Sequence, residues 1–184
     1  MGVSVDGYVA DRTGAFAWGE VSDELFACHL ARVRSLGAYL LGRRLYETML
    51  VWETDPTLRD TELGAEFAEV WSALPKVVFS RAGTRVQGNA RPAQAPLAEE
   101  IAAALATPGT DVEIGGAQLA GAAIELGLVD ELRIFRFPVL VGGGTRHLPP
   151  VTEDVPLELI GSQTFAPGVL HERYRILRRS SASA

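Results

Sequence analysis

The sequence predicts an α/β fold, with a mostly parallel central sheet flanked by helices and an antiparallel hairpin near the C-terminal end. Short β-rich runs alternate with longer runs of helical period, which is typical of parallel strands joined by helical crossovers. Two further strand-like runs follow, separated only by Ala-Pro-Gly, and this favours a hairpin. With 184 residues, the chain suits one domain with a substantial core.

The elements are assigned in chain order from hydrophobic periodicity and from turn residues. Ser22 is a suitable cap for the first helix, with Asp23 in its first turn, and Gly127 is placed to end the last one. The predicted helices are Ser22–Leu36, Arg44–Met49, Gly64–Ala73, Leu97–Ala106 and Gln118–Leu126. The predicted strands are Gly2–Val5, Ala38–Leu41, Lys76–Phe79, Val112–Ile114 and Leu132–Val141, and then Leu157–Phe165 and Val169–Leu177 in the hairpin.

Composition excludes several classes of protein. The net charge is -6 and the 17 lysines and arginines form no long block, so we expect no nucleic-acid partner and favour a small molecule. Cys28 is the only cysteine and the three histidines lie far apart, so we expect neither a disulfide nor a metal site. No apolar run is long enough to cross a membrane and no signal peptide is evident, so we expect a cytoplasmic protein.

An adjacent glycine pair, Gly115 and Gly116, stands in the stretch DVEIGGAQLAGAAIELGLVDELRI, where a strand gives way to a helix. Glycine lets a ligand approach the backbone closely, and the N-terminus of a helix attracts anions. The pair could equally form a tight turn without any ligand, and the local sequence leaves both interpretations open.

Two other strand ends carry groups that suit an anion. In AYLLGRRLYETM, Gly42 follows a strand and Arg43 and Arg44 open the next helix, where arginines are unfavourable without a nearby anion. In KVVFSRAGTR, a strand ends at Ser80 and Arg81. The arginines could also be ordinary exposed residues. Because ligands of open α/β sheets bind at the carboxyl ends of strands, the three sites together predict an extended phosphate-bearing ligand such as a dinucleotide.

Five stretches in order, SVDGYVA, LLGRRLYE, VVFSR, EIGGAQLAGAAIELGLVDELRI and PVLVGGGTRHLP, resemble the dihydrofolate reductase-like superfamily. The chain is most similar to the branch containing the C-terminal reductase domain of the bifunctional riboflavin-biosynthesis deaminase-reductase. The resemblance implies one such domain over residues 1–177, with no preceding deaminase domain. The first strand is shorter than in family members, and residues 178–184, which are small and polar, are expected to form a flexible tail. The resemblance also implies reduction of pterin-like or pyrimidine rings with NADPH, and a homodimer.

The resemblance further implies which residues hold NADPH. Gly42, Arg43, Arg44 and Leu45 would lie beside its phosphates, and Ser80 and Arg81 beside the adenosine ribose and its 2′-phosphate. The pyrophosphate and the nicotinamide side would be bound by Gly115, Gly116, Ala117, Gln118 and Leu119. The nicotinamide ring would be contacted by Val9 and Ala10. Because a guanidinium can grip the 2′-phosphate, we expect NADPH to be preferred over NADH.

At the substrate end the resemblance implies Trp18 and Phe26 as binding residues and Asp6 or Asp23 as the catalytic carboxylate. Asp23 fits a helix-capping role equally well, and Asp6 could simply make the turn before Gly7. We therefore predict a reductase similar to 5-amino-6-(5-phosphoribosylamino)uracil reductase. A dihydrofolate or pterin reductase, or a non-catalytic NADPH-binding module, are the alternatives.

Overall fold

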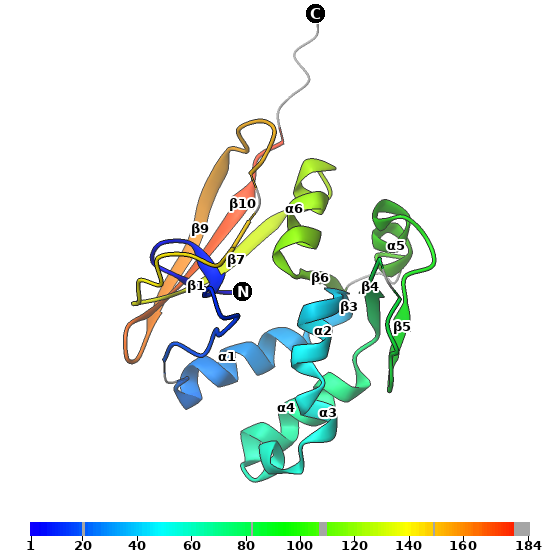
Figure 1. Cartoon of the computed structure of the whole chain (residues 1–184), viewed down its shortest axis with the longest axis vertical. Coiled ribbons are helices and arrows are strands. Elements are labelled where there is room, and N and C mark those ends of the chain that lie inside the picture. Colours follow the sequence, from blue (N-terminus) through cyan, green and yellow to red (C-terminus); the bar gives the residue numbers. More distant parts are fainter. Residues whose placement is uncertain (20, 82, 107–109, 149, 179–184) are drawn as a thin grey trace, which may run out of the picture. The chain divides into compact units, whose positions relative to one another are not determined.

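The computed structural model confirms the α/β fold, with a parallel sheet flanked by helices and with antiparallel strands toward the C-terminal end (Figure 1). It describes residues 1–19, 21–81, 83–106, 110–148 and 150–178. The chain folds as two compact units: Asp23–Ala120 form the central unit, and Met1–Ser22 with the segment from Gly121 onward form the terminal unit. The predicted flexible tail lies, apart from Arg178, outside the described residues.

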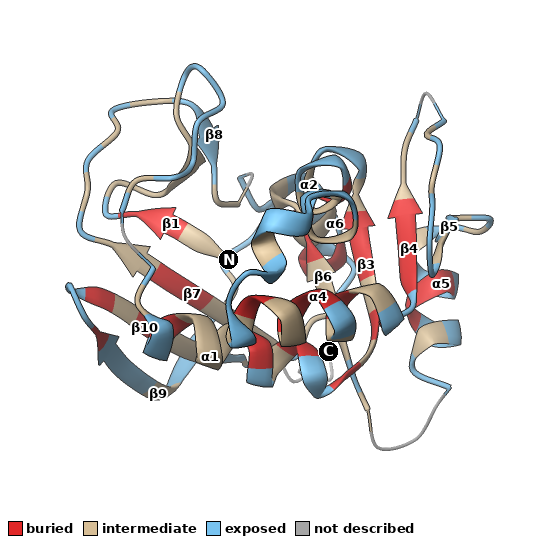
Figure 2. Cartoon of the chain, turned by 90° about the horizontal axis from the view of Figure 1, so that it is seen from below, coloured by how far each residue is buried: buried red, intermediate tan, exposed pale blue. Residues whose placement is uncertain are grey.

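A parallel four-stranded sheet forms the centre of the central unit. Its strands lie in the order β5 (Ala90–Pro92), β4 (Lys76–Phe79), β3 (Leu36–Gly42) and β6 (Asp111–Gly115). Each neighbouring pair is parallel. Figure 2 shows that β3 and β4 are largely buried, which explains their nearly continuous apolar sequences.

Helices pack on this sheet through an aromatic cluster. The rings of Phe26, Trp52, Phe67 and Trp71 stack in sequence, and Tyr39 meets Trp71 edge-on. The helices of the unit are α1 (Asp23–Arg34), α2 (Arg43–Met49), α3 (Val51–Thr54), the 3₁₀ helix η1 (Pro56–Arg59), α4 (Glu62–Ala73) and α5 (Leu97–Ala104). Helices α1 and α4 pack against each other around the buried Leu30, Val33 and Trp71.

The terminal unit contains a mixed four-stranded sheet. The order is β1 (Gly2–Ser4), β7 (Glu131–Phe137), β10 (Val169–Ile176) and β9 (Leu157–Phe165). Strand β1 is parallel to β7, whereas β10 is antiparallel to both β7 and β9, so the predicted hairpin is confirmed. A separate two-stranded ladder joins β2 (Tyr8–Ala10) to β8 (Thr145–Arg146), and α6 (Ala117–Glu125) runs from the central unit into this one.

Some predicted boundaries are wrong. The strand expected at Leu132–Val141 ends at Phe137, because Pro138 has no N–H with which to continue the ladder. The helix expected at Ser22–Leu36 ends at Arg34, since Leu36 already begins β3. The short elements β2, β5, β8, α3 and η1 were not predicted, because two to four residues carry too little periodicity.

Candidate functional site

The carboxyl ends of β4, β3 and β6 meet at one edge of the central sheet, which we call the carboxyl edge. Gly42 pairs with Phe79 of β4, and Leu41 pairs with Gly115 of β6. The structure therefore brings together the residues expected to bind the cofactor from three separate stretches: Gly42, Arg43, Arg44 and Leu45, then Ser80 and Arg81, and then Gly115, Gly116, Ala117, Gln118 and Leu119.

The strand order places a topological switch at this edge. The chain lays β4 and then β5 on one side of β3, and returns to lay β6 on its other side. Open α/β sheets bind ligands beyond the carboxyl ends of the strands at such a reversal. Here the reversal falls between Gly42 and the Gly115–Gly116 pair.

The two glycines of the pair are required for different reasons. Gly116 has a φ of +101°, which side-chain-bearing residues rarely adopt, and a Cβ there would lie only 3.5 Å from the backbone nitrogen of Gly42. Gly115 has no room for a side chain, since a Cβ would lie 2.5 Å from Cδ2 of Leu45 and 2.8 Å from the hydroxyl of Tyr39. Gly116 makes the turn, and Gly115 lets Leu45 and Tyr39 pack beneath it.

Arginines give the carboxyl edge a positive charge. Arg43 and Arg44 open α2 and are exposed, and the cap residue Gly42 offers no side-chain hydrogen bond to the helix. The guanidinium of Arg43 lies 3.1 Å from the Glu47 carboxylate one turn later. Arg44 makes no ion pair with any of the described residues, so its charge is available to a ligand.

The segment after β4 is held against α2. Ser80 Oγ donates to the carbonyl of Gly83 at 3.0 Å, and Tyr46 Oη accepts from the backbone nitrogen of Gln87 at 2.9 Å. Arg81 is exposed and has no ion pair within the described part of the chain. Tyr46 was not predicted to contribute to the site, because an aromatic residue in a helical pattern is ordinarily a core residue.

Asp6 holds a loop of the terminal unit. Its carboxylate accepts from Ser4 Oγ at 2.7 Å and from the backbone nitrogens of Gly142 and Val141 at 2.8 and 3.2 Å. These hydrogen bonds, that of Ser4 being the strongest, lower the pKa of the Asp6 carboxyl below its ordinary value. An ionised acceptor with these partners is suited to hold the 141–142 segment and is poorly suited to donate a proton.

Val9 and Ala10 lie on β2, beside the glycine run Gly142–Gly144. Ala10 pairs with Thr145 of β8, and a Cβ on Gly144 would collide with the carbonyl oxygen of Ala10. The Arg12 guanidinium donates to the carbonyl of Gly142. The glycine run therefore allows close packing of β2 and β8.

The residues expected at the substrate end belong to different units. Trp18, in the terminal unit, has a buried indole N–H without a hydrogen-bond partner among the described residues. Asp23 is exposed at the start of α1, and Phe26 stacks on Trp52 with a centroid distance of 5.6 Å, both in the central unit. The packing of Phe26 accounts for its presence without a substrate, so its binding role stays a prediction.

A chain of polar side chains leads from Tyr39, beneath Gly115, to the exposed Asp111. Tyr39 is paired directly with Glu113 of β6, and its hydroxyl lies near the Glu113 carboxylate. Arg32 Nε lies 3.0 Å from the Glu113 carboxylate, and its Nη1 lies 2.5 Å from that of Asp111. Burial, together with Glu113, raises the pKa of Tyr39 well above its ordinary value, so the hydroxyl keeps its proton. This chain was missed because its members are spread over three elements.

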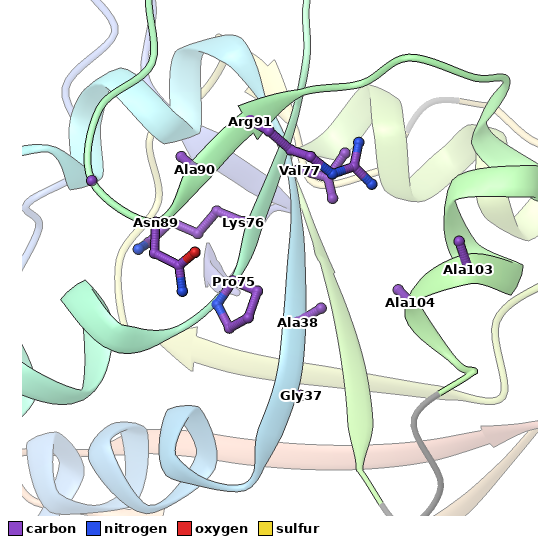
Figure 3. A pocket seen from close by; sticks show the side chains of 11 residues that line it. Gly37, Ala38, Pro75, Lys76, Val77, Asn89, Ala90, Arg91, Ala103 and Ala104 are labelled. Atoms are coloured by element: carbon purple, nitrogen blue, oxygen red, sulfur yellow. The ribbon is translucent and has the colours of Figure 1, made fainter.

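A pocket of about 360 Å³ lies at the opposite, amino edge of the same sheet (Figure 3). It is lined by the starts of β3, β4 and β5 and by the end of α5, and by none of the predicted site residues. Its charged and amide groups already have partners: Lys76 lies near Glu53, Arg91 binds Glu100, and Asn89 donates to the Ala73 carbonyl. The pocket therefore offers little specific chemistry to a ligand.

The described residues contain no cluster of histidine, cysteine, aspartate and glutamate side chains that could hold a metal ion. No described helix combines the length and apolar character needed to cross a membrane.

This chain is similar to one protein by sequence and to two solved structures by fold. It is 27% identical over 177 residues to the uncharacterized protein YyaP of Bacillus subtilis (strain 168), covering 95% of this chain and 91% of that one. A protein of Shewanella sp. PV-4 named for riboflavin biosynthesis superimposes with a TM-score of 0.74 at 23% identity, over 97% of both chains. The Thermotoga maritima diaminohydroxyphosphoribosylaminopyrimidine deaminase/5-amino-6-(5-phosphoribosylamino)uracil reductase gives 0.61 at 18% identity, over 96% of this chain and 55% of that one.

The sequence model of the RibD C-terminal domain matches residues 1–171, which is most of the chain. This match covers both units and all the stretches that form the carboxyl edge. It also agrees with the resemblance derived from the five sequence stretches. The chain belongs to the RibD C-terminal domain family, whose reductase-like character indicates an oxidoreductase acting on a small molecule.

Proposed function

We propose that this protein is an NADPH-dependent reductase of a pyrimidine-like or pterin-like heterocycle. The observation that carries the proposal is the carboxyl edge: the Gly42 and Gly116 backbones approach each other at a topological switch, flanked by exposed arginines. Membership in the RibD C-terminal domain family supports the reaction class. The name of the T. maritima relative supports a ribosylamino-pyrimidine as the substrate class.

The residues of the carboxyl edge fit a dinucleotide. Gly116 has the left-handed φ of a turn that brings the backbone close to a ligand, and Gly42 adds no side chain. Arg44 and Arg81 carry positive charge that no described carboxylate neutralises, which suits the phosphates of NADPH. Bound NADPH would supply hydride from C4 of its nicotinamide ring.

The chain's own residues act mainly by positioning. Gly42, Gly116 and the start of α6 would hold the pyrophosphate, and Arg81 with Ser80 would hold the adenosine 2′-phosphate and ribose. Val9 and Ala10 of β2 would meet the nicotinamide through backbone groups.

Asp6 holds the Val141–Gly142 segment, so Asp23 is the carboxylate left for the substrate end. The proton that accompanies reduction of a ring C=N or C=O then comes from Asp23 or from water.

Titration and turnover test this function. We expect the protein to bind NADPH at least tenfold more tightly than NADH, and to oxidise NADPH with a ribosylamino-pyrimidinone. Turnover with dihydrofolate instead would identify a pterin reductase. Tight NADPH binding without turnover on any heterocycle would identify a binding module, and failure to bind either dinucleotide would refute the proposal altogether.

We also propose a homodimer formed through the hairpin of the terminal unit. Leu157 and Leu159 of β9 are exposed, and Ile176 and Tyr174 of β10 pair with them on the same face of the sheet. An exposed apolar face of this kind is typical of an association surface. Light scattering at micromolar concentration should give a dimer mass for the wild type and a monomer mass for Leu159→Asp. A monomeric wild type would exclude this assembly.

A further inference from the structure

Tyr39 lies directly beneath the glycine pair. A Cβ added to Gly115 would lie 2.8 Å from the Tyr39 hydroxyl and 2.9 Å from Cε2 of its ring. Leu45, from the first turn of α2, fills the rest of that space. Tyr39 therefore contacts the residue that precedes the Gly116 turn, and Leu45 brings the start of α2 to the same point.

The ring and the hydroxyl of Tyr39 are both held in place. The ring meets Trp71 edge-on at a centroid distance of 5.7 Å, which fixes it from the side of α4. The hydroxyl lies near the carboxylate of Glu113, which Arg32 of α1 holds at 3.0 Å. A second ion pair, from Arg32 to Asp111, fixes the guanidinium. A side chain held at both its ring and its hydroxyl has a fixed position and supports the backbone packed on it.

We infer that Tyr39 is a positioning residue of the dinucleotide site, which fixes the position of the Gly115–Gly116 turn through its packing against Gly115. The inference rests on the proposed function. Tyr39 itself does not touch the ligand. It acts through Gly115, because the backbone of a glycine without a side chain can move toward any space that opens beneath it.

Removal of the hydroxyl opens such a space. Tyr39→Phe keeps the ring and its contact with Trp71, and it deletes the oxygen atom that lies under Gly115. The Gly115–Gly116 turn can then move toward the space that the hydroxyl occupied, and its N–H groups no longer align with the pyrophosphate. The adenosine end would be held by Ser80 and Arg81, which follow β4, so its binding should not change.

The experiment compares two ligands that differ at the site of the turn. NADPH carries the full pyrophosphate and nicotinamide, whereas 2′,5′-ADP has only the adenosine half. For Tyr39→Phe we expect the dissociation constant for NADPH to rise about tenfold, equivalent to about 1.4 kcal/mol, and that for 2′,5′-ADP to stay within about twofold. A merely structural role would weaken both ligands equally or neither.

Tyr174 supplies a matched control, because it is a second tyrosine whose hydroxyl lies at a glutamate: it donates to Glu172 at 2.7 Å in the terminal unit. Tyr174→Phe should leave both dissociation constants unchanged. Glu113→Gln keeps the tyrosine and removes the charge near its hydroxyl. It should raise the dissociation constant for NADPH by less than Tyr39→Phe does and leave that for 2′,5′-ADP unchanged. This variant replaces Tyr39→Phe if Tyr39→Phe does not fold.

The outcomes separate this inference from the proposed function. A wild type that fails to bind NADPH overturns the function and the inference together. If the wild type binds NADPH, the result for Tyr39→Phe, or for Glu113→Gln in its place, decides the inference alone. The inference is overturned if the variant binds both ligands as the wild type does, or if its affinity for both falls equally.

Discussion

The two edges of the central sheet carry the same kinds of side chain and use them differently. At the amino edge, Lys76 is buried and lies 3.3 Å from Glu53, and Arg91 makes two hydrogen bonds to the buried carboxylate of Glu100. At the carboxyl edge, Arg44 and Arg81 are exposed and have no ion pair within the described residues.

The difference shows that cations of one sheet can have two roles: those paired with a carboxylate stabilise the fold, and those left unpaired are available for binding. A cation that has a carboxylate partner inside the protein contributes to the fold, and its loss should change the free energy of unfolding. A cation left without one contributes little to the fold and can bind an anionic ligand. Substitutions of the paired charges at the amino edge should therefore change stability alone, and those of the unpaired arginines at the carboxyl edge should change binding alone.

The largest expected effect is at the amino edge. Glu53→Gln leaves the Lys76 ammonium buried without a counter-charge, which should lower the free energy of unfolding by about 3–5 kcal/mol. Urea denaturation measures this change, and the folded variant should bind NADPH normally. The double variant Glu53→Leu with Lys76→Met removes both charges and should recover much of the loss. A cost below about 1 kcal/mol for Glu53→Gln would show that the pair is not desolvated.

Glu100 should make stability depend on acid. Hydrogen bonds from Arg91, and then from the backbone of Gln94 and Ala95, lower the pKa of Glu100 to about 2. Because this pKa is lower in the folded state than in the unfolded chain, the stabilisation is present above about pH 4.5 and is lost as pH falls toward 2. Glu100→Gln should cost about 2–3 kcal/mol at neutral pH and flatten the acid limb of the stability curve. Identical acid limbs for the variant and the wild type would contradict this assignment.

Arg81 should affect binding without affecting the fold. Arg81→Ala should raise the dissociation constant for NADPH by about ten to a hundredfold, from the loss of a contact of about 1.5–3 kcal/mol, with little change for NADH. The melting temperature should stay the same. Arg85→Ala, another exposed arginine of the same segment, is the control and should leave both ligands unaffected. Equal affinity of the wild type for the two dinucleotides would remove the role of Arg81.

The smallest effect concerns Arg43, which is partly neutralised by Glu47 on α2. Glu47→Gln removes this exposed i,i+4 pair, worth about 0.2–0.5 kcal/mol, and leaves Arg43 freer to bind phosphate. NADPH binding should tighten by about twofold in calorimetric titration at low salt, and the gain should disappear at high salt. Weaker binding would instead indicate that Glu47 orients Arg43 for the ligand.

The role of the glycine pair Gly115–Gly116 could be predicted from the sequence only in part. Position after a strand and before a helix was enough to mark Gly115 and Gly116 as places of close backbone approach. The sequence could not show that Gly116 has a φ of +101°, or that Gly115 is required by Tyr39 and Leu45. A Gly116→Val variant should therefore lose some stability from backbone strain as well as binding.

Asp6 is a second example. The Ser-x-Asp-Gly stretch favoured a catalytic and a turn-making role equally, because both require an aspartate after a strand. The partners that separate these roles, Val141 and Gly142, lie more than 130 residues away in the chain. Phe26 was likewise expected to bind substrate, and its stacking on Trp52 and Phe67 became visible only in the folded chain.

The sequence by itself determined the fold class, the C-terminal hairpin and the three strand ends that carry glycine, serine and arginine, because periodicity and turn chemistry are local properties of the chain. The tertiary structure alone decided the strand order that places those ends at one switch point. It also decided which cations are neutralised by carboxylates and which side chains support the glycine turn. These depend on contacts between residues far apart in sequence, and such contacts leave no local pattern to read.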